Sequence, residues 1–436
     1  MVELKDKTKL IFHKGTHTIG GTLIEISYNK DRIFFDMGAV FNREVVVRSL
    51  DDLLDNDLTT YVDGVFDPKA SKKYPIKDDD FYENQAFFIS HAHLDHSSML
   101  NYTNPKIKLY TTKDSKKVIE ALNVDNKFIF PFSENQRKFY KYENFTREII
   151  GMDYDDKVEV GSISVRLIRV DHDSYGACGF IINTPDKKIS YTGDIRLNGF
   201  RKNDSLNFID QAKFSNLLIS EAVSYSFSEY GEDDGDEIGE KALNLKIRKT
   251  IFENKNKAIL INFYKANFER IEKIIEEVKE RKLVLSAYMA YVVKKVLGKD
   301  VLYYNLKGNS YNLDKKFELS LKDMAKDYKD YLIYFDKDSL ELVNLFKNSL
   351  YIHSDGEPLG EYDPLYKPFM EKLEENNIKV KFIETSGHAT TRDLTYILEK
   401  INPKIVTIIH SFRPEVVYYK SKKLLAPNDG EELFDF

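Results

Sequence analysis

The chain of 436 residues lacks tryptophan and contains a single cysteine, Cys178. One cysteine excludes an internal disulfide bond and fits a reducing compartment, in which a buried, inert thiol is the usual state. The 29 phenylalanines and 28 tyrosines take the place of tryptophan as large core-forming side chains. Because a chain of this length exceeds the single-core limit of about 250–300 residues, we expect two domains or one domain with a large insertion.

Long apolar runs and an excess of basic residues are also missing. The first residues mix charge signs, and no apolar run typical of a signal peptide or a membrane anchor follows them. We therefore expect a cytoplasmic protein with no membrane partner. The net charge of −6 argues against a passive nucleic-acid coat, which carries a basic face, so any contact with a nucleic acid must be local.

Short β-prone runs separated by glycine turns fill the first part of the chain. Residues 41–85 are polar and rich in Asp, Lys and Pro, and we expect a mainly irregular segment with a helical turn or two within 45–54. Strands are predicted at 10–12, 23–27, 33–38, 86–90, 162–170 and 188–192. The last three of these strands lead into polar residues that can carry chemistry.

Strand and helix signals alternate after Glu221. Strands at 258–263, 283–286, 301–304, 349–353 and 379–383, with amphipathic helices at 267–281 and 364–375, predict an open α/β domain inserted into the chain. A helix from about 391 to 400 and a strand at 405–410 follow it.

The strongest chemical signal is the sequence His91-Ala92-His93-Leu94-Asp95-His96, directly after the strand at 86–90. Histidines two apart on a strand-to-loop turn can face the same side, and the Asp-His pair can reach round to a second position. Imidazole and carboxylate suit divalent cations such as Zn²⁺, and the motif lacks the thiolates of a structural zinc centre. A purely structural role would have to explain three histidines and an aspartate within six positions, so the motif predicts a site for two metal ions.

Three more residues of ligand type each follow an apolar run: His172, Asp194 and His410. With these residues in this order, the chain resembles metallo-β-lactamase-fold hydrolases of the β-CASP group, the family of ribonuclease J and of the cleavage subunit of pre-mRNA 3′-end processing. The resemblance covers nearly the whole chain. It implies a metallo-β-lactamase αββα sandwich, formed by residues 1–221 and 385–436, with a β-CASP α/β cap domain, residues 222–384, inserted into it.

The resemblance also implies a role for each of these residues. His91, His93 and His172 would hold one metal ion, and Asp95, His96 and His410 would hold the other, with Asp194 as the bridge between them. Asp36 matches a carboxylate that orients the ligands, and Glu221 matches the acidic residue that opens the inserted lobe. His388 matches a histidine that contacts the scissile phosphate in RNA-cleaving relatives.

Weaker similarities lie in and beside the inserted lobe. The segment Ser354-Asp355-Gly356-Glu357-Pro358 resembles the Gly-Ser-Gln-Gly-Glu-Pro segment of ribonuclease J, and Asn267 to Arg270 resemble its Asn-x-x-Arg helix start. These similarities predict that Ser354, Glu357, Ser386 and His388 contact the substrate. The alternative is that residues 354–358 form an ordinary glycine-proline turn and that Asn267 starts an ordinary helix.

The function implied is hydrolysis of RNA phosphodiester bonds by a hydroxide that two divalent ions, zinc or manganese, activate, with Asp95, Asp194 and His388 as the catalytic residues. Cleavage would be endonucleolytic, 5′-exonucleolytic or both. RNA is favoured over DNA because the DNA-processing branch typically replaces the histidines that match His388 and His410, and single-stranded RNA in a narrow groove suits an acidic chain. The alternatives are a DNA nuclease of the same family, a thioester or lactone hydrolase, and an inactive scaffold subunit. A homodimer is compatible with each of them.

Overall fold

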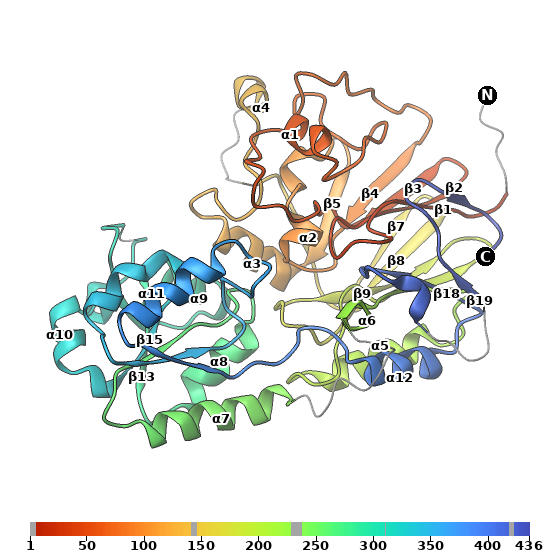
Figure 1. Ribbon diagram of the computed structural model, residues 1–436. Helices are drawn as coiled ribbons and strands as arrows, with labels where there is room; N and C mark the ends of the chain where they lie inside the picture. The colour runs from red at the N-terminus through yellow and green to blue at the C-terminus, as the bar shows by residue number, and fades with distance from the viewer. Residues whose placement is uncertain (1–5, 141–145, 228–237, 310, 418–422) are drawn as a thin grey trace. The chain divides into compact units, whose positions relative to one another are not determined.

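The computed structural model describes residues 6–140, 146–227, 238–309, 311–417 and 423–436 (Figure 1). The chain forms two compact units. The first unit consists of Met1–Leu197, Arg201–Gly235 and Gly387–Phe436, and the second of Asn198–Phe200 and Asp236–Ser386. The chain thus changes unit at 235/236 and 386/387, where the sequence analysis placed domain boundaries at 221/222 and 384/385.

The first unit contains two seven-stranded sheets. In the first sheet, β1 to β3 form antiparallel pairs, whereas β3 to β6 run parallel to one another. Its strands are, in spatial order, β20 (Glu432–Leu433), β1 (Lys9–Lys14), β2 (Leu23–Tyr28), β3 (Asp31–Phe35), β4 (Asn84–Phe88), β5 (Lys108–Thr112) and β6 (Ile150–Met152). Parallel neighbours bring the carboxyl ends of β3 and β4 to the same edge.

The second sheet has an antiparallel half and a parallel half. Strands β7 to β10 form antiparallel pairs, and β10, β11, β18 and β19 run parallel. The spatial order is β19 (Lys423–Leu425), β18 (Ile405–Ile409), β11 (Leu217–Glu221), β10 (Lys188–Tyr191), β9 (Cys178–Asn183), β8 (Ile163–Arg169) and β7 (Lys157–Val160).

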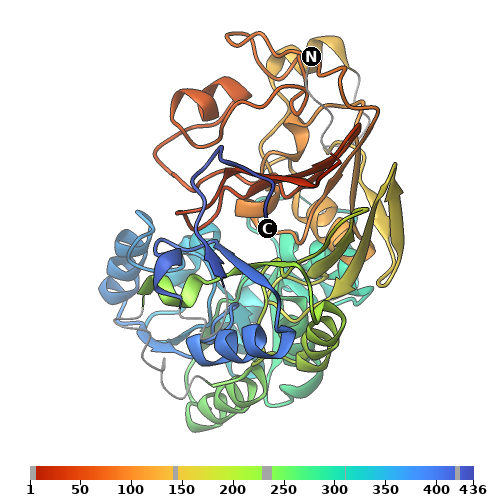
Figure 2. The same cartoon turned by 90° about the vertical axis from the view of Figure 1, so that its right-hand side faces the viewer.

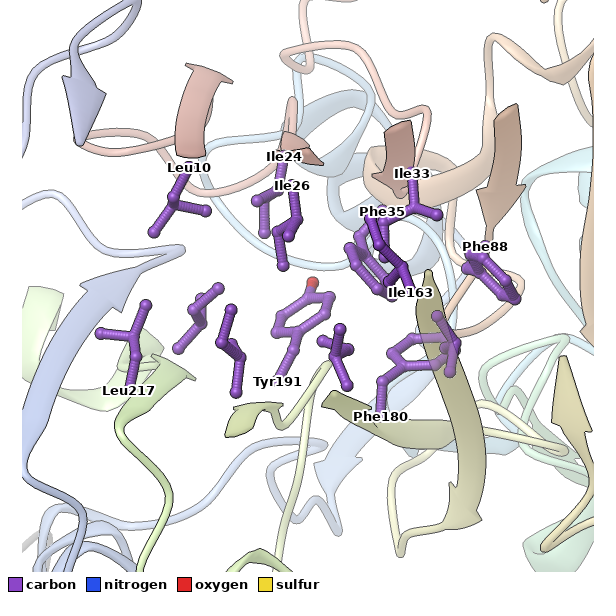
Figure 3. Packing of buried hydrophobic residues seen from close by; sticks show 14 of the residues in the cluster. Leu10, Ile24, Ile26, Ile33, Phe35, Phe88, Ile163, Phe180, Tyr191 and Leu217 are labelled. Atoms are coloured by element: carbon purple, nitrogen blue, oxygen red, sulfur yellow. The ribbon is translucent and has the colours of Figure 1, made fainter. Parts of the chain in front are cut away.

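The two sheets pack face to face over an apolar core. Side chains from the first sheet, such as Leu10 and Phe35, point toward those of the second, such as Leu217 and Phe180 (Figure 3). Every second residue along β8 enters this core, because side chains on a strand alternate between its two faces. The core includes the single cysteine, Cys178. Burial and the nearby Asp36 carboxylate raise the pKa of this thiol, so it stays protonated.

Helices cover the outer faces of both sheets. Helices α5 (Lys202–Ala212) and α12 (Thr391–Ile401) lie side by side and pack their apolar faces on the second sheet through residues such as Phe208 and Ile397 (Figures 1 and 2). On the first sheet, α3 (Lys113–Leu122) packs against β5 and β6. The shorter helices of this unit are α1 (Leu50–Asp55), α2 (Leu94–Ser97), η1 (Leu100–Tyr102), α4 (Glu134–Phe139), α6 (Val223–Phe227) and η5 (Pro414–Val416). The layers of this unit are therefore α, β, β and α.

The second unit is an open parallel sheet with helices around it. The strand order is β14 (Leu302–Tyr304), β13 (Lys282–Ser286), β15 (Tyr331–Tyr334), β12 (Ile259–Ile261), β16 (Leu350–His353) and β17 (Lys379–Phe382). The helices are α7 (Glu240–Glu253), α8 (Phe268–Glu277), α9 (Ala287–Leu297), η2 (Lys315–Phe317), α10 (Leu321–Lys326), η3 (Tyr328–Asp330), η4 (Lys337–Asn344) and α11 (Tyr366–Glu375).

The structure confirms the predicted strands and helices and corrects one helix end. The helix expected over 267–281 ends at Glu277, because Val278 adopts an extended conformation and turns the chain toward β13. Segment 41–85 holds one short helix, α1, as expected. Other elements, among them β5, α3, α9 and β15, were not predicted.

Arg270 is the centre of a buried ionic cluster in the second unit. Its guanidinium, which is 1% exposed, lies 2.9 Å from both carboxylate oxygens of Glu240 and 2.6 Å from Oδ2 of Asp355. The same guanidinium donates to the carbonyl of Ser354, and Asn267 caps α8 while donating to Glu240. The cluster therefore ties together α7, α8 and the loop after β16.

Replacing Glu240 with glutamine should destabilise the second unit by about 3–5 kcal/mol, because the buried Arg270 charge would lose its principal partner. Chemical denaturation measures this loss as a lower midpoint. Glu253→Gln is the matched control on the same helix, since Glu253 only approaches Lys249 at the surface and should cost less than about 1 kcal/mol. Equal effects of the two substitutions would contradict the structural role of the cluster.

Candidate metal centre

The predicted site residues of the first unit gather at the carboxyl ends of its strands. Asp36 follows β3, and the histidine motif begins three residues after the end of β4. On the second sheet, His172 follows β8, Asp194 follows β10, Glu221 ends β11 and His410 follows β18. The strand ends of two packed sheets thus deliver imidazole and carboxylate groups from distant parts of the chain to one place.

The motif itself is a short turn into a helix. His93 is the N-cap of α2, so the chain reverses direction between His91 and His96. Both of these histidines are fully buried. The loop after Asp36 packs directly on this turn: a Cβ atom at Gly38 would lie 1.6 Å from the carbonyl oxygen of Asp95, so only glycine fits there.

The ligand-type atoms form overlapping groups, each with its atoms within 4.8 Å of one another. Asp194 belongs to two groups, and its Oδ2 lies 3.5 Å from Nε2 of His91, 3.4 Å from Nε2 of His96 and 3.3 Å from Nε2 of His410. The groups are His91, His93, His172 and Asp194; His91, Asp95 and His96; and His96, Asp194 and His410. Asp194 therefore stands where one carboxylate can face two neighbouring cation positions.

Buried polar atoms without hydrogen-bond partners support this interpretation. Within the residues that the structure describes, Nε2 of His91, Nε2 of His96 and both carboxylate oxygens of Asp194 lack a hydrogen bond although they are shielded from water. An unsatisfied buried polar atom is costly, and most such atoms in native proteins have a partner. A divalent cation supplies the missing partner, so the residues present fit a metal site.

Hydrogen bonds on the far side of each ring turn the ligand atoms inward. Nδ1 of His96 donates to Asp36 at 2.8 Å, and Nδ1 of His172 donates to the carbonyl of Gly387 at 2.5 Å. A carboxylate and a carbonyl only accept, so each of these rings carries a proton on Nδ1 and turns Nε2 toward the centre, where a metal ion would take the Nε2 lone pair. Such partners are typical of metal-binding histidines.

Asp36 is a buried hydrogen-bond acceptor next to the cluster. Its carboxylate is fully buried and accepts hydrogen bonds from Ser90, His96 and the hydroxyl of Tyr191, the last at 2.6 Å. The hydroxyl oxygen of Ser90 also lies 2.9 Å from Nδ1 of His91. Asp36 thus joins both ends of the histidine motif to the opposite sheet.

The buried Glu221 and the partly exposed His388 form a pair beside the cluster. Oε1 of Glu221 lies 3.1 Å from Nδ1 of His388 and accepts the backbone N–H of Ile195, the residue after Asp194. Burial alone would lower the pKa of His388, but the carboxylates of Glu221 and Asp194 raise it to about 9. His388 is therefore positively charged at neutral pH and is held 3.8 Å from Oδ2 of Asp194.

The histidines of the cluster differ in charge. Burial lowers the pKa of His91 and His93, and it lowers that of His172 to about 3, so these rings are neutral. Burial also opposes charge on His410, but Asp194 and Asp95 raise its pKa to about 10. A proton on His410 occupies the place that a metal ion would take, and ligation must expel it.

Asp173, for which no role was predicted, joins the cluster. Its Oδ1 lies 3.3 Å from Nε2 of both His93 and His172. Burial alone would raise the pKa of this carboxyl, but the neighbouring histidines lower it to about 2. Its position next to His172 in the sequence was the one available signal.

The three remaining predicted residues lie in the second unit. Ser354 is fully buried, and its hydroxyl lies 3.3 Å from Arg270, whereas Glu357 forms an ion pair with Lys337 at 2.8 Å. Ser386 is the last residue of this unit and precedes Gly387. The predicted contacts of all three with a substrate stay predictions.

Comparisons with known proteins agree with this fold and site. Residues 59–213 match the "Beta-lactamase superfamily domain", and residues 375–420 match the "Zn-dependent metallo-hydrolase RNA specificity domain". A crystal structure of a protein of unknown function from Enterococcus faecalis is 38% identical, with a TM-score of 0.89 over 98% of this chain and 100% of that one.

Two named relatives are more distant. The "Probable RNase MJ4" of Methanocaldococcus jannaschii is 24% identical, and the alignment covers 98% of this chain and 99% of the relative. The "Ribonuclease J" of Mycoplasma genitalium is also 24% identical, over 93% of this chain and 68% of the relative.

Two packed sheets with a histidine and aspartate cluster at their strand ends define a metallo-β-lactamase-fold metallo-hydrolase. Because both family models match in chain order and the named relatives align along 98% and 93% of the chain, it belongs to the β-CASP family of ribonuclease J-like nucleases. The predicted family and fold class are confirmed.

Metal uptake should release protons and should strengthen as the pH rises. The pKa of His410, about 10 without a metal ion, means that its ring is protonated at pH 7 and must lose that proton to become a ligand. Calorimetric titration of metal-free protein with Zn²⁺ or Mn²⁺, in buffers of different ionisation enthalpy, measures the release. His13→Gln should leave it unchanged because His13 pairs with Glu25 outside the cluster. Absence of proton release would contradict the proposed electrostatics.

Asp36→Asn should weaken metal affinity by about 10–100-fold, since partners of metal-binding histidines typically contribute this much. The amide cannot accept the hydrogen bonds of Ser90, His96 and Tyr191 together. Competition with a chromophoric chelator measures the affinity. Asp63→Asn, which changes an exposed carboxylate of the same unit, should have no effect, and equal affinities of both variants would refute the role of Asp36.

Proposed function

We propose that this chain is a metal-dependent ribonuclease that hydrolyses the phosphodiester bonds of RNA. The observation that carries the proposal is the shared position of Asp194, which faces two groups of buried ligand atoms and lies beside the charged imidazole of His388. A carboxylate between two cation positions and a proton donor next to it are the elements that phosphodiester hydrolysis requires.

The ligand set that we propose holds two divalent ions. His91, His93 and His172 would hold one ion, Asp95, His96 and His410 the other, and Asp194 both. Zinc is favoured because the matching family model describes a Zn-dependent metallo-hydrolase, and manganese accepts the same ligand types. When bound, two such ions would supply an activated water nucleophile and offset the negative charge of the transition state.

The chain's own residues would prepare the reaction in three ways. Asp95 and Asp194 would provide the negative charge that keeps the cations in place, and Asp36 would keep two histidine rings in orientation. Nδ1 of His388 pairs with Glu221, so Nε2 would point to the substrate. There it would either bind a non-bridging phosphate oxygen or protonate the leaving oxygen. The buried Glu221 keeps this imidazole charged in the free enzyme, because it raises the pKa.

RNA is the substrate that the comparisons favour. The two named relatives are called RNases, and one matching family model is described as an RNA specificity domain. The presence of both His388 and His410 supports RNA over DNA, because the DNA-processing branch typically replaces them. All seven proposed ligand residues are present, which argues against an inactive scaffold subunit.

Several finer features stay predictions of the resemblance. They are the choice between endonucleolytic and 5′-exonucleolytic cleavage, the preference for single strands, the homodimer and the cytoplasmic location. Among the described residues, no helix has both the length and the hydropathy needed to cross a membrane. Substrate contacts of Ser354, Glu357 and Ser386 are part of the same proposal.

Incubation with single-stranded RNA should give cleavage that a chelator abolishes and added Zn²⁺ or Mn²⁺ restores. Asp194→Asn should abolish cleavage, because both groups of ligand atoms lose their shared carboxylate. His388→Gln should reduce the rate by about 10²–10⁴-fold, as expected for loss of a general acid, while the bound metal content stays that of the wild type. Gel analysis of end-labelled RNA and mass spectrometry of the metal content measure the two effects.

Lys202→Gln, at an exposed position on α5, is the control and should cleave like the wild type. A matched DNA, a thioester and a lactone test the rival activities in the same assay. Chelator-sensitive hydrolysis of one of these without hydrolysis of RNA would refute the ribonuclease, as would full RNA cleavage by Asp194→Asn.

A further inference from the structure

A polar cavity of about 450 Å³ lies in the first unit, on the face of the second sheet that points away from the sheet-on-sheet core. Val165 and Leu167 of β8 enter that core, so Ser164 and Arg166 point the other way and line the cavity. Asn183 of β9, Lys188 of β10 and Gln211 of α5 complete most of its wall.

This cavity is separate from the metal centre. Arg166 is the middle residue of β8, and His172 follows the carboxyl end of that strand. At a rise of about 3.3 Å per residue, the three strand steps from Arg166 to Arg169 alone cover about 10 Å, and His172 follows beyond that strand end. A ligand in the cavity would therefore not touch the reacting groups.

Among the described residues, the charged side chains that line the cavity are all cationic, and none is a carboxylate. Lys157, Arg166 and Lys188 contribute three positive charges to the lining. Burial lowers the pKa of Lys188, and repulsion by Arg166 lowers it further. Lys188 donates to two backbone carbonyls at 2.9 Å, those of Gln211 and Lys213, and Lys157 forms an exposed ion pair with Glu159. Two cations thus lie close together with no acid between them.

Several donors of the lining have no partner within the protein. Across the described part of the chain, the side chains of Ser164, Arg166 and Asn183 make no hydrogen bond or ion pair, and Nε of Arg166 is shielded from water. Nε of Arg166 is the buried donor among them, and a buried donor without an acceptor is unfavourable, so it normally has an external partner. The partner must be rich in acceptor atoms and negatively charged.

We propose that this pocket binds the phosphate group of a phosphorylated ligand. The planar guanidinium of Arg166 matches two phosphate oxygens at once, and Lys188 adds a point charge. Ser164 and Asn183 add neutral donors. The volume exceeds that of one phosphate and falls in the usual range of ligand pockets, and Ile181 gives it an apolar wall for an attached group. Phosphate groups of this kind occur within an RNA chain and on a free nucleotide.

Calorimetric titrations with orthophosphate, with adenosine monophosphate and with single-stranded RNA test the proposal. The RNA titration contains chelator so that the strand stays intact. Arg166→Gln should weaken binding of at least one of these ligands about tenfold or more, the usual effect of losing a charge-assisted hydrogen bond. Arg166→Lys keeps the charge but loses the planar guanidinium, so its affinity should lie between that of Arg166→Gln and that of the wild type.

Lys202→Gln removes one exposed positive charge from the same unit and should bind like the wild type. Weakening with RNA alone would identify the RNA backbone as the source of the phosphate, and weakening with the monophosphate would identify a free nucleotide. Because Arg166 forms no hydrogen bond or ion pair with the described side chains, its replacement should leave the fold intact, which circular dichroism checks. Asn183→Ala, expected to weaken binding about threefold, gives an independent check. Equal binding by Arg166→Gln, Asn183→Ala and the wild type in every titration would overturn the proposal. The outcome does not depend on the ribonuclease activity, since binding is measured without cleavage.

Discussion

The buried carboxylate of Asp194 is the constraint on which the candidate site depends. Three histidine nitrogens approach one of its oxygens within 3.5 Å, and both oxygens lack a hydrogen bond within the described residues. Burying this charge is costly unless a cation balances it. Protons on His96 and His410 provide part of that balance without a metal ion, because nearby carboxylates raise the pKa of both rings. Divalent ions would balance the carboxylate charge in place of these protons.

The fold makes this arrangement possible by bringing strand ends together. Asp194 and Glu221 follow parallel neighbours of one sheet, and the histidine motif follows a strand of the other. Asp36 joins the two sheets, because its carboxylate accepts hydrogen bonds from both the ring of His96 and the hydroxyl of Tyr191. The apolar core in Figure 3 holds the sheets in register beneath these contacts. The metal centre and the sandwich therefore depend on each other.

Much of this site was predictable from the sequence, because its ligands follow apolar strands and share one local motif. His91 to His96 are close in space because they are close in sequence, and His172, Asp194 and His410 are each announced by the strand before them. The role of Asp173 was not predictable, since its contact with His93 arises only when β8 packs near the motif. The burial of Ser354 against Arg270 was hidden for the same reason. Short strands such as β5 and β15 carry too few periodic residues to be recognised alone.

The pocket at Arg166 extends this account beyond the metal centre. It uses the face of the second sheet that the core does not need, at the strand ends opposite the ligands. An acidic chain with net charge −6 thereby has a local cationic surface in addition to its candidate metal centre.

The most direct test of the central claim is a crystal structure of the metal-loaded protein, with anomalous diffraction measured at the absorption edge of the metal. The account predicts two anomalous peaks about 3.5–4 Å apart on either side of Asp194, one near His91, His93 and His172 and the other near Asp95, His96 and His410. A metal-loaded crystal with no anomalous peak at Asp194 would contradict it.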